Sequence, residues 1–284
     1  MKCKHFQKYE GLGNDFILVY KGEEDEESWF INNAKSLCDR HYGIGADGIL
    51  LLSPTTKRFC DVRMSVINAD GSRAEMCGNG IRAVALHRSR VQENTDAPLL
   101  IETDQGILTC QVEEVNEMEG IVQVDMGPVQ WEGEIPWTFA DRSFRLSLLR
   151  VGNPHAVTFD PFLEQDYVAM GEQISQHPQF IEGTNVEWVT MRESTSMEVM
   201  IWERGVGLTL ACGTGACAVA AAACEKGLAP WDIPLFLHLP GGILTIQMRS
   251  SDRHALMRGP VRHVYSGEFY CLRYCGFKGE KCYS

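Results

Sequence analysis

The sequence predicts an α+β fold of two similar domains, each a mixed, mostly antiparallel sheet curled around a central helix, related by a pseudo-two-fold axis. The first observation is a repeat: residues 77–80 and 212–215 both read Cys-Gly-x-Gly, and both run into Ala-Val-Ala without a helix breaker. The likeness also extends backwards, because a polar cluster ending in glycine and, further upstream, a Gly-Asn pair precede each cysteine. Finally, strand-like segments adjoin through tight turns with few helices between them, which disfavours a doubly wound parallel sheet.

A repeat of this length indicates an internal duplication, in which each half offers one cysteine to a shared cleft. We expect an N-terminal half at residues 1–125, joined by the tail at 264–284, that carries Cys77. The C-terminal half, residues 126–263, carries Cys212. The active site is expected in the cleft between the halves.

The composition is that of an ordinary globular chain of two domains, with 284 residues, 44% hydrophobic and 23% charged. The net charge of -12 disfavours nucleic acid and anionic membranes as partners. The first residues lack the apolar stretch of a signal peptide, so we expect a cytoplasmic protein with its eleven cysteines reduced. The irregular spacing of Cys271, Cys275 and Cys282 does not suit a zinc site, and no metal is expected.

Hydrophobic patterning and turn residues place the elements of each half. In the first half we expect strands at 15–20, 49–52, 62–66, 99–103, 107–112 and 120–126, a helix after the acidic run 23–27, and the Cys77 helix to about Arg90. In the second half we expect a strand after Asn153, a helix near 161–175, strands near 185–190 and 197–203, the Cys212 helix, and strands within 230–239 and 242–248. Both cysteines therefore stand at the start of a helix.

A cysteine at a helix start is suited to chemistry, because the helix dipole stabilises a thiolate and depresses the pKa of the thiol. The unshielded amides of Gly78, Asn79, Gly213 and Thr214 could bind a carboxylate. Two such thiols facing each other across a carbon could remove a proton from one face and deliver one to the other, which inverts a stereocentre. The alternatives are buried, inert cysteines or a phosphate site, although the P-loop pattern is absent from the sequence.

Several motifs, taken together, resemble the diaminopimelate epimerase family over nearly the whole chain. They are Gly11-Leu12-Gly13-Asn14-Asp15-Phe16, Gly43-Ile44-Gly45-Ala46-Asp47-Gly48, Asn68-Ala69-Asp70-Gly71-Ser72, Met76-Cys77-Gly78-Asn79-Gly80, Gly152-Asn153-Pro154-His155, Glu203-Arg204-Gly205 and Ala211-Cys212-Gly213-Thr214-Gly215. The motifs occur in the family's order, and their joint presence is highly specific.

The resemblance implies a homodimeric epimerase, independent of pyridoxal phosphate and of any other cofactor, that interconverts LL- and meso-2,6-diaminopimelate in lysine and peptidoglycan precursor biosynthesis. It implies that Cys77 accepts the α-proton of the LL substrate and that Cys212 donates one. His155 and Glu203 would tune the two thiols, and the amides of residues 78–79 and 213–214 would hold the α-carboxylate. The implied substrate-reading residues are Asn14, Asn68, Asn153, Asn185 and Arg204.

Three features depart from the family pattern: Gly48 stands where some members have a substrate-binding Gln, Arg73 adds a cation before Cys77, and the tail is long and rich in cysteine. Two alternatives therefore stay open. One is a related racemase, independent of pyridoxal phosphate, that acts on another amino acid such as glutamate. The other is a thiol redox protein without catalytic activity, in which Cys77 and Cys212 form a reversible disulfide.

Overall fold

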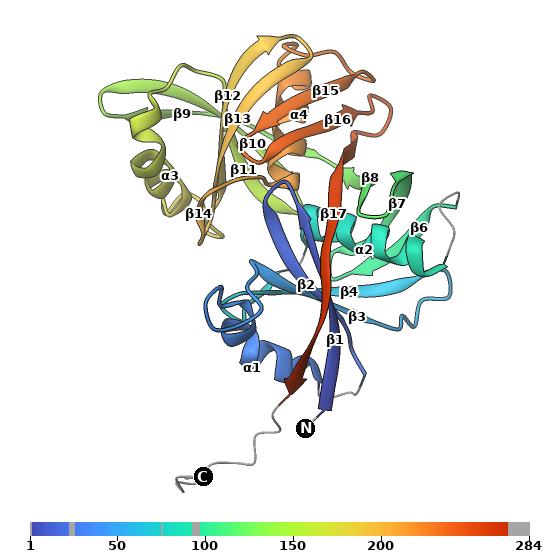
Figure 1. Ribbon diagram of the computed structural model, residues 1–284. Coiled ribbons are helices and arrows are strands. Elements are labelled where there is room, and N and C mark those ends of the chain that lie inside the picture. Colours follow the sequence, from blue (N-terminus) through green and yellow to red (C-terminus); the bar gives the residue numbers. More distant parts are fainter. Residues whose placement is uncertain (1, 23–25, 75, 93–96, 272–284) are drawn as a thin grey trace, which may run out of the picture.

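The computed structural model describes residues 2–22, 26–74, 76–92 and 97–271, whose strands form one continuous sheet that closes into two rings, each around one helix (Figure 1). Tail residues Cys275 and Cys282 lie outside the described residues, as does the start of the acidic run at 23–25. Among the helices of the described part, none is long and apolar enough to cross a membrane.

The first ring of this sheet closes around helix α2 (Gly78–Gln92). Its strands are β1 (Lys2–Gly11), β2 (Asn14–Tyr20), β3 (Gly48–Ser53), β4 (Val62–Asn68), β5 (Arg73–Ala74), β6 (Leu99–Thr103), β7 (Gly106–Val115), β8 (Glu119–Pro128) and part of β17 (His254–Cys271). Pairing runs β8–β7–β6–β4–β3–β2–β1–β17 and back to β8, with β5 added on β4. Helix α1 (Glu26–Cys38) packs outside the ring, on β3 and β4.

The second ring surrounds helix α4 (Gly213–Glu225). Its strands are β9 (Gln130–Phe139), β10 (Arg142–Val151), β11 (Asn153–Thr158), β12 (Asn185–Glu193), β13 (Ser196–Glu203), β14 (Gly207–Thr209), β15 (Pro234–Leu239), β16 (Gly242–Met248) and the start of β17. Pairing runs β9–β10–β11–β12–β13–β15–β16–β17, and β17 pairs with β8, which continues into β9. The 3₁₀ turn η1 (Glu164–Asp166) and helix α3 (Tyr167–Ser175) lie outside this ring.

The two rings share one topology, which confirms the predicted duplication. The pairs β2–β3 and β11–β12 are parallel and are joined through an outer helix, whereas β4–β6 and β13–β15 are parallel and are joined through an inner helix. Strands β8 and β9, separated only by Val129, together correspond to the long β17. The domain boundaries at 125 and 263 remain a prediction.

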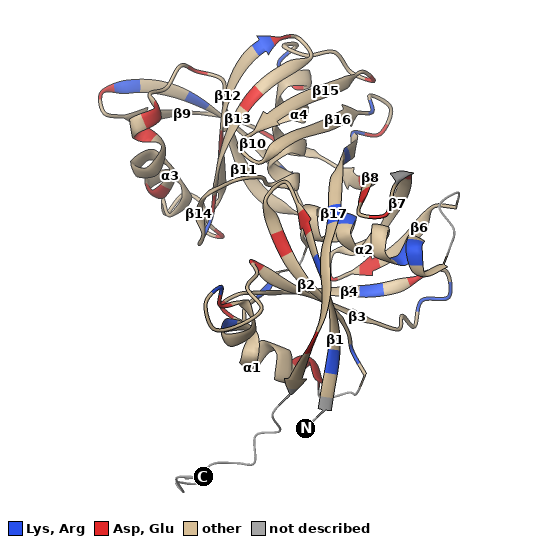
Figure 2. Cartoon of the chain, in the orientation of Figure 1, with Lys and Arg blue, Asp and Glu red and all other residues tan. Residues whose placement is uncertain are grey.

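The inner helices are buried along most of their length, as expected for helices enclosed by strands, and only their C-terminal ends are exposed. Every residue of α4 from Gly213 to Cys224 is buried, and no charged residue occurs in this helix before Glu225 (Figure 2). The alanine-rich sequence keeps the helix thin, so that strands can approach it from every side. This enclosure fixes the start of each inner helix relative to the sheets.

Six strands were not anticipated by the sequence patterns: β1, β9, β10 and β17, and the short β5 and β14. The lysine-rich β1 hides its alternation, and β9 contains Gly133 and Pro136, which read as strand breakers. The helix expected near 161–175 begins only at Tyr167, after η1. The strand expected within 230–239 begins at Pro234, because Asp232 adopts a left-handed turn conformation with φ 60°.

Candidate active site

The two cysteines stand at the starts of inner helices that touch each other. A Cβ placed on Gly78 would lie 3.1 Å from the Cα of Gly213, and a Cβ on Gly213 would lie 3.1 Å from the Cα of Gly78. Met257 of β17 packs against both positions. This close approach leaves no room for side chains, which explains why glycine follows cysteine in both motifs.

Cys77 is half-buried at the start of α2, and its Sγ accepts a hydrogen bond from the amide of Gly80 at 3.3 Å. The Oδ1 of Asn14 lies 4.0 Å from the same sulfur. The buried side chain of Asn79 donates to Asn14 Oδ1 and to the carbonyl of Ala211, both at 3.2 Å. The Asn79 side chain therefore joins the two helix starts, and its backbone amide is the part suited to a substrate.

Cys212 is the N-cap of α4 and is 8% exposed. Its Sγ accepts a hydrogen bond from the amide of Gly215 at 3.4 Å and lies 3.3 Å from the Oγ1 of Thr214. The Gly215 amide thus donates a hydrogen bond to Cys212 in the same way as the Gly80 amide donates one to Cys77. Both cysteines are free thiols.

The sequence predicts depressed pKa values for both thiols, and the structure shows the opposite. Burial raises the pKa of Cys77 to about 11 and that of Cys212 well above its usual range, and the carboxylate of Glu203 adds to both shifts. The amides of Gly80 and Gly215 lower the two pKa values, as the helix-start argument requires, but their effect is smaller than that of burial. The prediction failed because the depth of burial cannot be read from a helix-start motif.

His155 is buried on β11 and is held at both ring nitrogens. Its Nδ1 lies 2.6 Å from Oε1 of Glu187, and its Nε2 lies 3.0 Å from Oδ1 of Asn153. Burial raises the pKa of the Glu187 carboxyl, and the neighbouring His155 lowers it by a smaller amount. A Cβ on Gly215 would lie 2.8 Å from Glu187 Oε1, so this carboxyl reaches the first turn of the Cys212 helix.

Glu187 belongs to none of the motifs that predict the site, although the sequence around it contains a signal for a buried acid. It is the acidic residue in the apolar segment Val186-Glu187-Trp188-Val189 of β12. All four residues of this segment are buried. A carboxyl that points inward from an otherwise apolar strand needs a buried partner, and here the partner is His155.

Glu203 is half-buried at the end of β13, beside Cys212 and Thr209. Burial raises the pKa of its carboxyl, and nearby Thr209 and His155 lower it. Because Glu203 also acts electrostatically on Cys77, it lies near both thiols. This position suits the thiol-tuning role that was predicted for it.

The structure brings together some of the predicted substrate-reading residues and not others. The backbone amide of Arg204 donates to Oδ1 of the buried Asn185 at 3.0 Å, and the exposed guanidinium is held by the carbonyl of Glu182. Asn68 is exposed at the end of β4 and donates to Ser72 within its own turn. Among the described residues, Asn68 has no hydrogen bond to another candidate residue.

Two departures from the family pattern have structural explanations. A Cβ on Gly48 would lie 2.9 Å from the carbonyl oxygen of Ile67 on the paired strand β4, so the strands need glycine there. Arg73 forms an ion pair with Glu27 of α1 at 2.6 Å. Its charge is therefore compensated by the protein.

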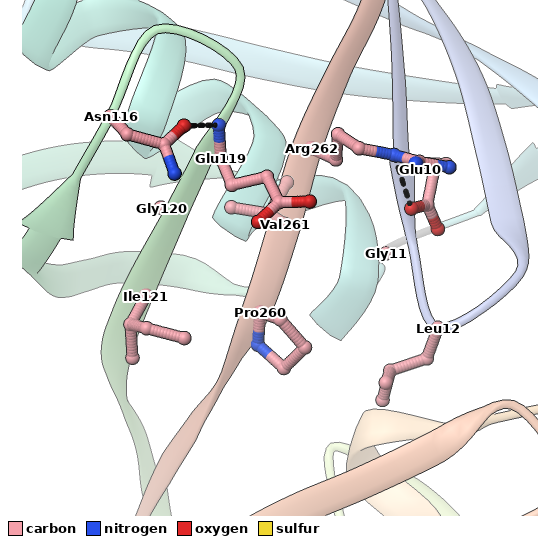
Figure 3. Close-up of a pocket in the computed structure, with 10 residues that line it drawn as sticks. All are labelled: Glu10, Gly11, Leu12, Asn116, Glu119, Gly120, Ile121, Pro260, Val261 and Arg262. Carbon is pink, nitrogen blue, oxygen red and sulfur yellow. Dashed lines mark hydrogen bonds and ion pairs between the residues drawn. The ribbon is translucent and has the colours of Figure 1, made fainter.

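A pocket on the first ring, shown in Figure 3, is separate from this site. It lies between the β1–β2 turn and β8, and Arg262 pairs at 3.1 Å with its neighbour Glu10 on the adjacent strand (Figure 3). No predicted catalytic or substrate-binding residue lines this pocket. Within the described part of the chain, no group of three or more His, Cys, Asp or Glu side chains is arranged to hold a metal ion.

Solved structures with the same fold include a predicted epimerase from Pseudomonas aeruginosa, with a TM-score of 0.74 at 12% identity over 95% of this chain and 100% of that chain. A hydroxyproline epimerase from Agrobacterium vitis has a TM-score of 0.70 at 13% identity, over 94% of this chain and 92% of that chain. At these identities the similarity establishes the fold alone.

Sequence similarity is much closer to one family. Residues 6–132 and 147–264 match the diaminopimelate epimerase family model. A diaminopimelate epimerase from Synechocystis sp. is 37% identical over 279 residues, covering 93% of this chain and 98% of that protein. Another from Synechococcus sp. is 40% identical over 282 residues, covering 92% and 96%. With its two cysteine helices and these similarities, the chain belongs to the diaminopimelate epimerase family.

Proposed function

We propose that this protein interconverts LL- and meso-2,6-diaminopimelate with two bases, Cys77 and Cys212, and without pyridoxal phosphate or a metal. The observation that carries the proposal is the contact between two equivalent helix starts. Each carries a cysteine whose sulfur accepts a hydrogen bond from the backbone amide three residues further on. Membership of the family supports diaminopimelate as the substrate.

In the LL-to-meso direction, the Cys77 thiolate removes the α-proton and becomes a thiol, while the Cys212 thiol delivers its proton to the opposite face and becomes a thiolate. The roles exchange in the reverse reaction, so the pair always holds one proton between turnovers. The raised pKa of each thiol makes its thiolate a stronger base, although it also makes the thiolate rarer near neutral pH. A strong base is needed, since the α-proton of an amino acid is a weak acid.

The developing negative charge must be stabilised by fixed dipoles. The first amides of a helix have no carbonyl partner within the helix, and those of Gly78, Asn79, Gly213 and Thr214 meet where α2 touches α4. They would bind the α-carboxylate from two sides in surroundings largely shielded from water. Arg204 would bind the distal carboxylate, for which its planar guanidinium is well shaped.

Solvent exchange tests the proposal directly. LL-diaminopimelate is incubated in deuterated water with the wild type and with Cys77→Ala, Cys212→Ala and Cys217→Ala. We expect deuterium at the α-carbon together with the meso isomer for the wild type and for Cys217→Ala, whose thiol is buried within α4 away from the helix start. Epimerisation should be lost in the other two variants. A Cys77→Ala or Cys212→Ala variant that epimerises at the wild-type rate would refute the two-base mechanism.

The alternatives give different results in the same assays. A racemase of another amino acid would exchange the α-proton of glutamate or alanine faster than that of diaminopimelate. A redox protein would show no exchange with any amino acid under reducing conditions, but would form a Cys77–Cys212 disulfide on mild oxidation. The proposal further includes a cytoplasmic location and a homodimer; light scattering should give twice the mass of one chain.

A further inference from the structure

Arg82, in α2, is a buried cation whose role the motifs leave open. Its side chain is 0% exposed, and none of the ion pairs among the described residues includes it. Its Nε donates to the carbonyl of Pro260 at 3.3 Å, its Nη1 to the carbonyl of Gly78 at 3.2 Å and its Nη2 to Oδ1 of Asn79 at 3.0 Å. Glu10 acts on the guanidinium only electrostatically, without a direct ion pair. Because a buried charge that lacks a direct ion pair is destabilising, the presence of this cation calls for a function.

The protein makes room for this guanidinium with glycine. A Cβ on Gly11 would lie 3.1 Å from Arg82 Nη2, and a Cβ on Gly259 would lie 3.4 Å from Arg82 Nε. Burial lowers the pKa of Arg82 to about 10, which leaves the side chain protonated near neutral pH. The site is therefore shaped around a charged arginine.

Arg82 determines which way the Asn79 carboxamide points. A guanidinium can only donate hydrogen bonds, so it must face the oxygen of Asn79 rather than the nitrogen. The Asn79 Nδ2 then faces two acceptors, the carbonyl of Ala211 and the Oδ1 of Asn14, both at 3.2 Å. Ala211 immediately precedes Cys212, so Asn79 ties the start of α2 to the start of α4.

The orientation of the Asn14 carboxamide is fixed by a hydrogen bond at its nitrogen. Its Nδ2 donates at 2.9 Å to the carboxylate of Asp47, which can only accept and which also pairs with Arg40. The Oδ1 of Asn14 is left facing Asn79 and the sulfur of Cys77. Hydrogen bonds thus run in one direction from Arg82 through Asn79 and Asn14 to Asp47, from a buried cation to a carboxylate, and pass beside Cys77.

We propose that Arg82 is a positioning residue for the reaction: by orienting Asn79, it fixes the Asn14 oxygen beside Cys77 and the backbone carbonyl that precedes Cys212. The inference rests on the proposed function. Arg82 is fully buried, so it would not contact the substrate itself. Its loss should therefore lower kcat by displacing the two sulfurs and leave KM nearly unchanged.

The decisive variant is Asn79→Asp, which has the same shape and gives Arg82 a carboxylate partner, so that folding should be kept. Its side chain has no N–H group to donate to Asn14 or Ala211. We expect kcat to fall about a hundredfold, the size typical of a displacement of about 1 Å at a reacting group. Arg82→Met should show a similar loss. Arg82→Lys keeps the charge but not the planar set of donors, and should be about tenfold impaired.

Arg88→Met is the matched control, since Arg88 lies on the same helix and contacts the Tyr20 hydroxyl rather than the cysteines. It should keep the wild-type kcat. A folded Asn79→Asp variant with the wild-type kcat, or an Arg82→Met variant that only raises KM, would overturn the inference.

A second readout does not depend on activity. The rate of iodoacetamide alkylation at Cys77 and Cys212, followed by peptide mass spectrometry, should change severalfold in Asn79→Asp and stay constant in Arg88→Met. Unchanged rates at both cysteines in Asn79→Asp would refute the relay even if the wild type proved inactive on diaminopimelate. Changed rates together with an inactive wild type would support the relay and refute the proposed function.

Discussion

Substitution of Gly213 by alanine is the sharpest test of the contact between the two cysteine helices. The new Cβ would lie 2.9 Å from Met257 Sδ and 3.1 Å from the Cα of Gly78. Carbon atoms in contact prefer about 3.5–4.0 Å, so the helix starts must separate by about half an ångström. Met257 can rotate away, but the backbone of Gly78 cannot, because it begins an enclosed helix.

Overpacking of this kind destabilises a protein by about 1–3 kcal/mol. The larger effect should be on activity: the displaced helix carries Cys212 and the amides proposed to hold the carboxylate, so we expect kcat to fall about a hundredfold. The assay pairs urea unfolding with the initial rate of meso formation from LL-diaminopimelate.

Gly227→Ala is the matched control. Gly227 has φ 68°, and a Cβ there would meet no atom within 4 Å, so alanine would be strained without moving the site. It should lose about 1 kcal/mol of stability and keep the wild-type kcat. If Gly213→Ala were destabilised yet kept its kcat within about threefold, the contact would not set the catalytic geometry.

Three further predictions follow. Stability should fall as pH rises above about 8.5, because unfolded thiols ionise there, whereas burial raises the pKa of folded Cys217 to about 12. At about pH 10 the free energy of unfolding should be lower by about 2 kcal/mol per buried thiol. Urea titrations should find a smaller decrease in Cys217→Ala than in the wild type. Glu187→Gln can still accept a hydrogen bond from His155 and should lower kcat about tenfold, whereas Glu187→Leu should lose about a hundredfold. Arg204→Ala should reduce kcat/KM for diaminopimelate about a hundredfold, with little effect on exchange of alanine.

Each of these predictions has an outcome that would contradict it. A Cys217→Ala variant with the pH dependence of the wild type would mean that this thiol ionises in the folded state. Equal kcat values for Glu187→Gln and Glu187→Leu would show that His155 needs no partner at Nδ1. Equal losses on diaminopimelate and alanine in Arg204→Ala would exclude a role at the distal carboxylate.

The sequence predicts the duplicated halves and the cysteine helices because these depend on local patterns. A Cys-Gly-x-Gly turn before an unbroken apolar run indicates a helix start wherever it occurs, and its recurrence implies equivalent folds. Strand β1 escapes such reasoning, since its pairing with β2 and β17 rather than its composition makes it a strand. The raised thiol pKa values and the roles of Glu187 and Arg82 likewise depend on contacts between distant segments.

The duplication makes the fold symmetric, but the two thiols have different surroundings. In the equivalent turns, Cβ atoms on Gly80 and Gly215 would meet Leu50 and Glu187 respectively, so an acid lies against the first turn of the Cys212 helix where an apolar side chain lies against that of the Cys77 helix. The arginine five residues after Cys77 corresponds to a neutral cysteine in the second copy. Burial and the Glu203 carboxylate raise the pKa of both thiols, whereas Arg82 lowers that of Cys77 by a smaller amount and Glu187 raises that of Cys212 further.

This asymmetry matters for the proposed reaction. Of the two states that hold a single proton, the surroundings favour the one in which Cys77 is the thiolate and Cys212 keeps the proton, because the pKa of Cys212 is raised further than that of Cys77. That is the state needed to act on the LL isomer, with the base on one face and the acid on the other. A symmetric pair of thiols would be poised equally for both directions, whereas divergence of the two copies after duplication gives the two sulfurs different pKa values.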